Sequence, residues 1–144
     1  MHVEQQALAR VAEPDARDLG WFAARQPGII RFLEQRLGGD ADAHGVALLG
    51  AWRIHSAFAA RDDLPPPRVE RSLLDRAAIA VAMESRHGAD DGCAARQPDL
   101  CGWLVGWLAD PPVPLEASDS ARVGAVLAAV IYALDQLTTG RPIP

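Results

Sequence analysis

The stretch FAARQPGIIRFL, residues 22–33, is nearly repeated by CAARQPDLCGWL, residues 93–104. At an offset of 71 positions the two segments share the five consecutive residues AARQP, and apolar residues then fall on apolar residues. Self-similarity at a fixed period is typical of a chain built from structural repeats. The sequence therefore predicts an internal duplication, and this duplication organises the fold.

The similarity extends to both sides of the two segments when small gaps are allowed. Residues 3–10 resemble residues 69–76, and residues 45–52 resemble residues 124–131. The largest gap falls in DPPVPLEASDS, residues 110–120, where proline and polar residues indicate a loop that can absorb an insertion. The first repeat is predicted over about 3–63 and the second over about 68–138.

Each repeat is predicted to contain three helices, because Pro27 and Pro98 suit the first position of a helix and LPPPRVE, residues 64–70, separates the halves. Asp42, Ser118 and Asp119 are predicted to cap helix N-termini. About six helices result, at residues 3–24 (with a break near Glu13 and Pro14), 27–37, 43–61, 68–87, 98–109 and 119–138.

Composition favours one all-α domain spanning residues 1–144. Half of the residues are hydrophobic (49%) and 23% are charged, which supplies enough apolar material for a single core. Alanine is abundant and costs least in a helix, whereas runs of β-branched residues are missing. The predicted fold is a compact bundle of two pseudo-symmetric three-helix repeats.

The third helix of each repeat is predicted to lie in the centre, because it is apolar on nearly every side. One copy alone could not enclose such a helix. The two copies are therefore expected to pack about a pseudo-twofold axis, with both third helices inside.

Charge and hydropathy exclude several functional classes. The net charge of -5 and the isoelectric point near 5.2 disfavour a nucleic-acid partner, which needs a clustered positive face. The apolar run from Val123 to Leu134 is too short to span a bilayer, and the N-terminus lacks the apolar core of a secretory signal, so we expect a cytoplasmic protein without membrane contact. Cys93 and Cys101 match no zinc-binding spacing and are expected to be reduced and structural.

The duplicated ARQP motif suggests a binding site or a pair of structural connectors. Arg25 and Arg96 could present two guanidinium groups to an anionic ligand, with Gln26 and Gln97 beside them. Alternatively, each motif joins two helices by hydrogen bonds to nearby carbonyl groups. The second interpretation is the simpler one, since duplicated sequence explains duplicated residues without a ligand.

The fifth predicted helix has a face that differs from its counterpart in the first repeat. Gly102 and Gly106 form a G-x-x-x-G spacing, flanked by Trp103 and Trp107, where the first repeat has polar residues. Such a face permits close approach of another helix. The covering helix could come from the same fold or from a second copy of the chain.

A metal-dependent or small-ligand enzyme is the alternative function. Glu84 and His87 form an E-x-x-H spacing, Glu70 lies near the same helix stripe, and His55 falls on a helix predicted to be central. A carboxylate-bridged metal pair needs a second E-x-x-H and two further glutamates, which the sequence does not supply.

The sequence leaves open whether the protein is an enzyme, and it implies no cofactor. We expect a protein–protein interaction or self-association module, with a protein partner or a homodimer as the assembly. The interaction is expected to involve the fifth helix and the ARQP connectors.

Overall fold

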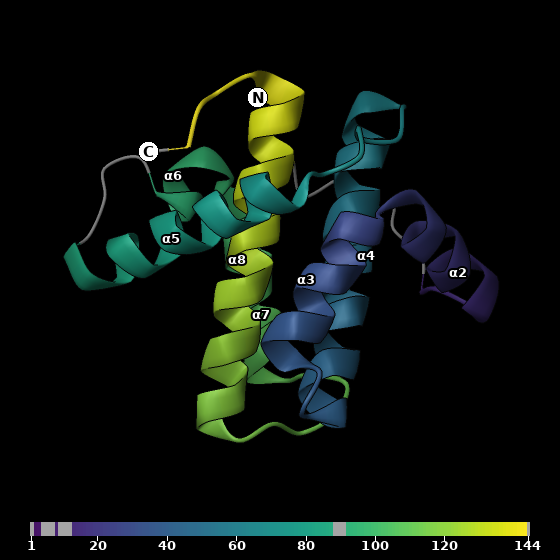
Figure 1. The fold of residues 1–144 in the computed structure, drawn as a ribbon, viewed down its shortest axis with the longest axis vertical. Coiled ribbons are helices and arrows are strands. Elements are labelled where there is room, and N and C mark those ends of the chain that lie inside the picture. The colour runs from purple at the N-terminus through teal and green to yellow at the C-terminus, as the bar shows by residue number, and fades with distance from the viewer. Residues whose placement is uncertain (1, 4–7, 9–12, 88–91, 144) are drawn as a thin grey trace.

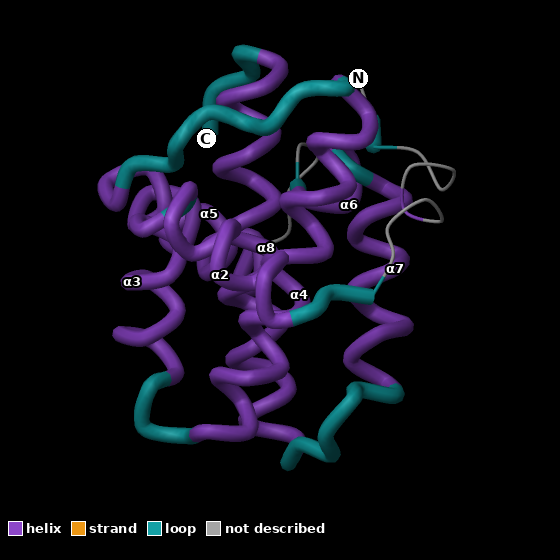
Figure 2. Tube along the Cα trace, turned by 90° about the vertical axis from the view of Figure 1, so that its right-hand side faces the viewer, coloured by secondary structure: helices purple, strands orange, loops and turns teal. Residues whose placement is uncertain are grey.

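The computed structural model describes residues 2, 3, 8, 13–87 and 92–143, and all its regular structure is helical (Figures 1 and 2). The two longest helices, α4 (Ala41–Asp62) and α8 (Ala117–Thr139), pack against each other, and the shorter helices lie around them. The helices are α2 (Ala16–Arg25), α3 (Pro27–Leu37), α4 (Ala41–Asp62), α5 (Arg71–His87), α6 (Cys93–Arg96), α7 (Pro98–Ala109) and α8 (Ala117–Thr139).

The prediction of an all-α fold is confirmed, and five of the observed helices end within a few residues of their predicted limits. Pro27 and Pro98 occupy the first positions of α3 and α7, as expected. The one-turn helix α6 was not predicted. Of the helix predicted at 3–24, most of the part before Glu13 lies outside the described residues. The later part is α2, whose N-terminus has a capping box between Asp15 and Asp18.

Helix α8 runs through the middle of the molecule, with α4 and α5 packed against it (Figure 1). Residues 129–135 of α8 are all buried, so every side of this segment faces protein. Helix α4 buries one broad face and leaves the other partly exposed. The prediction that the third helix of each repeat is central therefore holds for α8 and for one face of α4.

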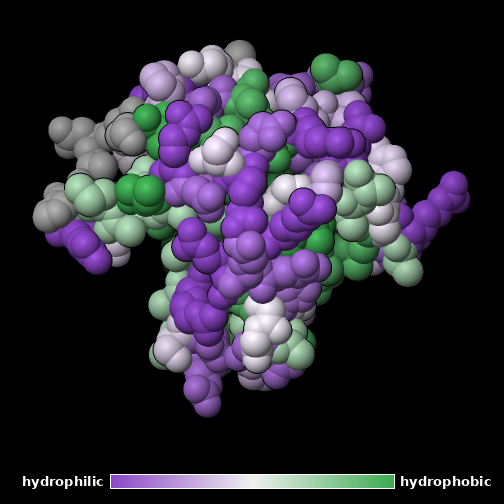
Figure 3. Space-filling view, viewed as in Figure 1, coloured by the Kyte–Doolittle hydropathy of each residue, from purple (hydrophilic) through white to green (hydrophobic). Residues whose placement is uncertain are grey.

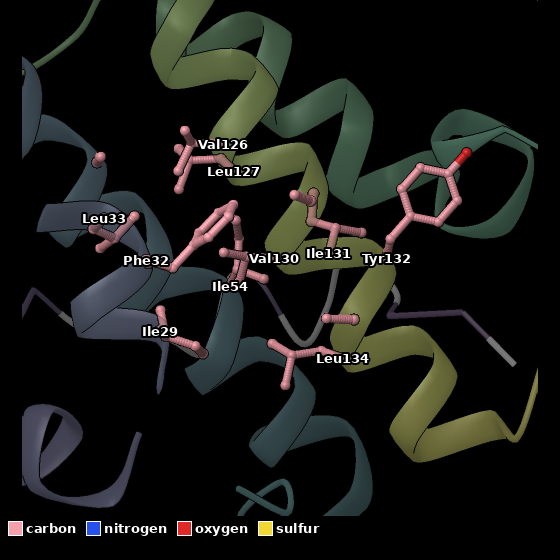
Figure 4. Close-up of a cluster of buried hydrophobic side chains, with 14 of the residues drawn as sticks. Ile29, Phe32, Leu33, Ile54, Val126, Leu127, Val130, Ile131, Tyr132 and Leu134 are labelled. Carbon is pink, nitrogen blue, oxygen red and sulfur yellow. The ribbon is translucent and has the colours of Figure 1, made fainter. Parts of the chain in front are cut away.

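The core lies where α3, α4 and α8 meet. Ile29, Phe32 and Leu33 of α3 point toward Ile54 of α4 and toward the apolar side chains of α8, whereas Tyr132 points away from this cluster (Figure 4). Burying one such aliphatic or aromatic side chain contributes about 1.5–3 kcal/mol. The pseudo-symmetry of the two halves stays a prediction.

Helix α8 is the one helix in the described part of the chain whose length and apolar composition would suit a membrane span. Half of its apolar 18-residue segment is buried within the protein. Hydrophilic residues cover much of the molecular face in Figure 3, with smaller apolar patches between them. The burial of α8 is that of a core helix.

Candidate functional site

Helix α7 presents an exposed face of small and apolar residues, formed by Gly102, Val105 and Gly106, which we call the α7 face. Leu100 and Leu104 on the opposite side are buried in the core. Val105 is 72% exposed. A Cβ atom placed on Gly102 or Gly106 would meet no described atom within 4 Å, so the described part of the chain leaves this face uncovered.

The two tryptophans of α7 lie beside this face and contact the rest of the protein. Trp103 and Trp107 stack with ring centroids 5.3 Å apart. The ring of Trp107 lies so close to Gly50 of α4 that a Cβ there would stand 2.7 Å from its Cζ3 atom. Gly50 therefore makes room for Trp107, which joins α7 to α4 in addition to flanking the α7 face.

Gln26, in the first ARQP motif, is fully buried between α2 and α3. Its Oε1 atom accepts a hydrogen bond from the Val69 N–H at 2.9 Å, and its Nε2 atom donates to the Pro67 carbonyl at 2.9 Å. Its Nε2 atom also lies 3.2 Å from Nε2 of His55. The side chain thus fastens the segment before α5 to the first half of the chain.

His55 is buried in α4 and held in its neutral form. Because Gln26 uses its oxygen for Val69, its amide nitrogen donates and the Nε2 atom of His55 accepts, which places the imidazole proton on Nδ1. Burial, and secondly the charge of Arg25, lower the pKa of His55 to about 4. The ring also packs against Phe22 at 5.1 Å. The neutral imidazole therefore has a structural role, since it packs against Phe22 and accepts a hydrogen bond from Gln26 inside the core.

Gln97, in the second ARQP motif, makes the corresponding contacts. Its Oε1 atom accepts from the Val3 N–H at 2.7 Å, and its Nε2 atom donates to Oδ1 of Asp135 at 2.8 Å. Asp135 of α8 therefore has the role that His55 has in the first half. At the offset of 79 positions that relates residues 45–52 to residues 124–131, His55 pairs with Leu134, so the residue that bonds to Gln97 is the next one along α8.

The two ARQP arginines lie in different surroundings. Arg25 is exposed, with its guanidinium 4.9 Å from the centre of the Trp21 ring. Arg96 is buried, lies 3.7 Å from Oδ2 of Asp135, and stacks over Tyr132. The motifs therefore do not present a symmetric pair of guanidinium groups on the surface.

Arg96 also holds the C-terminal segment. Its guanidinium donates to the carbonyl oxygens of Arg141 and Pro142. Buried arginine needs such acceptors because an unpaired charge in the interior is costly. Arg96 and Gln97 together connect both ends of the chain to α8.

The four candidate metal ligands are not assembled into a described metal site. Glu84 is half-buried, and its Oε2 atom accepts from the Tyr132 hydroxyl at 2.7 Å and from the Cys93 N–H at 3.3 Å. Glu70 is exposed, and His55 bonds to Gln26 instead. His87 ends α5, and its side chain lies outside the described residues. The described residues contain no group of three or more histidine, cysteine or acidic side chains that could hold a metal ion.

Cys93 and Cys101 form a disulfide, which corrects the expectation that both are reduced. Their Cα atoms are 6.6 Å apart, within the range that a disulfide spans. The helix is interrupted at Gln97, between α6 and α7, and this interruption brings Cys93 close to Cys101, eight residues further along the chain. A spacing of eight alone did not reveal this pairing, because it depends on where the helix is interrupted.

A pocket of about 200 Å³ lies between α4 and the end of α7. Trp52 and Trp107 contribute aromatic walls, and Arg53 and Asp110 contribute opposite charges. Arg53 is ion-paired with Glu13 at 3.0 Å, and Glu13 also lines the pocket. Two of the charged side chains that line the pocket are therefore already paired with each other.

Comparisons with known proteins supply no relative: the chain matches no protein-family model, and no curated protein or solved structure is significantly similar to it.

The sequence did not reveal Asp135, which lies beside Arg96, or Tyr132, which donates to Glu84. A single acidic residue next to the apolar run of α8 was the available signal, since a buried carboxylate requires a partner.

Proposed function

We propose that this protein self-associates through the α7 face, with a second copy of the chain as its partner. The observation that carries the proposal is that a Cβ on Gly102 or Gly106 would meet no described atom within 4 Å, combined with the 72% exposure of Val105 between them. Removing such a face from water is favourable, and two glycines one turn apart let a second backbone approach closely.

A second copy fits this face better than a charged partner does. The α7 face carries no charged side chain, so it offers no electrostatic complementarity to a strongly acidic or basic surface. A smooth apolar helix face is complementary to itself, and two copies related by a twofold axis would bury both faces at once. Gln26, Arg96 and Gln97 are occupied within the fold, so the proposal rests on α7 alone.

Light scattering after size exclusion tests the proposal with two variants. Gly106→Arg places a long charged side chain on the α7 face, where its Cβ meets no described atom within 4 Å, and it is expected to weaken the dimer at least about tenfold. Gly20→Arg is the matched control, because Gly20 is likewise an exposed helical glycine with open space around it, but it lies in α2.

The expected result is a concentration-dependent dimer for the wild type and for Gly20→Arg, and a monomer for Gly106→Arg. Circular dichroism checks that both variants keep the helical content of the wild type. A wild-type protein that stays monomeric at high micromolar concentration, or a Gly106→Arg variant that still dimerises, would overturn the proposal.

We also infer that the fold consists of two copies of one three-helix unit. The support comes from hydrogen bonds that cross between the halves: Gln26 of the first half holds Val69 of the second, and Gln97 of the second half holds Val3 of the first. The sequence comparison pairs Gln26 with Gln97 and Val3 with Val69 independently of these bonds. Each half would thus complete the other.

A further inference from the structure

The Cys93–Cys101 disulfide spans the junction of α6 and α7 and encloses the second ARQP motif. Arg96 and Gln97, inside this loop, hold the C-terminal carbonyl groups and the Val3 N–H. The bond is therefore placed where it can control how both chain ends are attached. Cys93 is buried, whereas Cys101 is only half-buried.

The first half of the chain secures its own ARQP motif without a disulfide. At the offset of 71, Phe22 stands at the position of Cys93 and Ile30 at the position of Cys101. Phe22 is fully buried and Ile30 packs against the core. Helix α2 before this motif has 10 residues, whereas α6 has 4. Apolar packing and a longer helix hold the first connector, and a covalent bond holds the second.

We propose that Cys93–Cys101 is a reversible redox site that fastens the second ARQP connector and, through it, the C-terminal segment. The reductant is a dithiol. Its thiolate attacks Sγ of the more accessible Cys101, the S–S bond breaks, and the Cys93 thiolate leaves and takes up a proton. The second thiol of the reductant then attacks the mixed disulfide, so that the dithiol is oxidised and Cys101 is released as a thiol.

Exchange with a small-molecule disulfide reverses these steps and restores the bond, with two electrons passing to that disulfide. Cys93 belongs to the buried core and Cys101 packs against it, but both lie on α6 and α7. Reduction therefore removes the covalent link while the contacts among α3, α4 and α8 stay in place. The expected response is local opening at the second connector, with the first connector unaffected.

Trypsin cleavage tests this proposal with an internal control. The Arg25–Gln26 and Arg96–Gln97 bonds have the same neighbouring sequence, AARQP, so trypsin meets the same residues at both sites. Three samples are compared: oxidised wild type, wild type reduced and then freed of reductant under nitrogen, and the double variant Cys93→Ser with Cys101→Ser. Fragments are separated under reducing conditions, because the disulfide would otherwise hold a cut chain together.

The expected result is that cleavage at Arg96–Gln97 accelerates at least about tenfold in the two open samples, while cleavage at Arg25–Gln26 changes less than about twofold. Thiol titration of the unfolded chain should find no free thiol before reduction and two after it. Adding oxidised glutathione to reduced wild type should restore slow cleavage.

Three results would overturn the proposal. The first is two free thiols in protein purified without reductant and then treated with oxidised glutathione. The second is equal Arg96–Gln97 cleavage in all three samples. The third is equal acceleration at both ARQP bonds, which would mean that the disulfide supports the whole fold; an unfolded double variant would give this result and would be detected by circular dichroism.

Discussion

Buried polar side chains at two sites determine how the connectors are held. Gln26 and Gln97 are fully buried, and each amide bonds to a backbone N–H on one side and to a side chain of a long helix on the other. An amide can do this because it carries a donor and an acceptor in fixed positions. The partner of the first is neutral His55, and the partner of the second is Asp135, which also faces Arg96.

The stability of the fold should fall as the pH is lowered, because His55 is held neutral. Its pKa is about 4 in the folded protein and 6.5 when unperturbed, so below pH 6.5 the unfolded chain binds a proton that the folded chain does not. The loss from this residue should reach about 2 kcal/mol between pH 7.5 and pH 5, and none should occur above pH 7.5.

Urea unfolding of wild type and His55→Gln across this pH range measures the effect. The variant removes the titrating group but keeps a side chain that can accept from Gln26. Its unfolding free energy should fall by about 2 kcal/mol less than that of the wild type over the same interval. Parallel pH profiles for the two proteins would show that His55 does not have the lowered pKa.

At the scale of the helices, the packing of the Trp107 side chain of α7 against α4 depends on a glycine. Gly50 faces the ring of Trp107 and a methyl group of Leu127, at 2.7 Å and 2.6 Å from a Cβ atom built at that position. The tryptophan ring is rigid, so it can yield only if the helices move apart. The Trp107 side chain therefore packs against α4 at Gly50, while the main helix neighbours of α7 are α6 and α8.

Replacing Gly50 by alanine should destabilise the protein by about 1–3 kcal/mol, because the added methyl group overpacks this contact. Gly45→Ala in the same helix is the control, since a Cβ there meets no described atom within 4 Å. That variant should be more stable by up to about 1 kcal/mol through helix propensity. Thermal or urea unfolding distinguishes them, and equal stabilisation of both variants would contradict the packing argument.

Helix limits were more predictable than helix caps. Proline positions located the starts of α3 and α7, because proline favours the first turn and restricts the residue before it. The predicted cap Asp42 was wrong, because Asp40 caps α4 by accepting from the Ala43 N–H. The predicted caps Ser118 and Asp119 were wrong as well, because both lie inside α8, which begins at Ala117 after Glu116 and has no side-chain cap. Asp40 and Asp42 are both residues that favour an N-cap, and the sequence alone does not show at which of them the backbone turns into the helix.

At the scale of the whole molecule, each half depends on the other for enclosure. The buried segment of α8, residues 129–135, packs against α4 and α5 from opposite halves. The segment before α5 is bonded to Gln26, and Val3 is bonded to Gln97. Separation of the halves would expose apolar surface and leave these buried amides without their partners.

The fragments 1–63 and 64–144 should therefore be mostly unfolded alone and should regain native helical content when mixed. The reason is that a unit of this size is marginally stable at best, and each half alone would also expose the apolar surface that the other half covers. Circular dichroism of each fragment and of the equimolar mixture measures this. A fragment with full native helicity and cooperative unfolding alone would contradict the mutual dependence of the halves.

Periodicity, proline positions and alanine content determined the helical class, the approximate limits of most helices and the apolar character of α8, because these features depend on local spacing and propensity. The tertiary structure decided which polar residues became partners: Gln97 with Val3, Arg96 with Asp135, and Cys93 with Cys101. The first two contacts depend on how the chain folds back on itself, and Val3 and Gln97, 94 positions apart, carry no local signal that they will meet. The third joins residues only eight positions apart, but it depends on where a helix is interrupted.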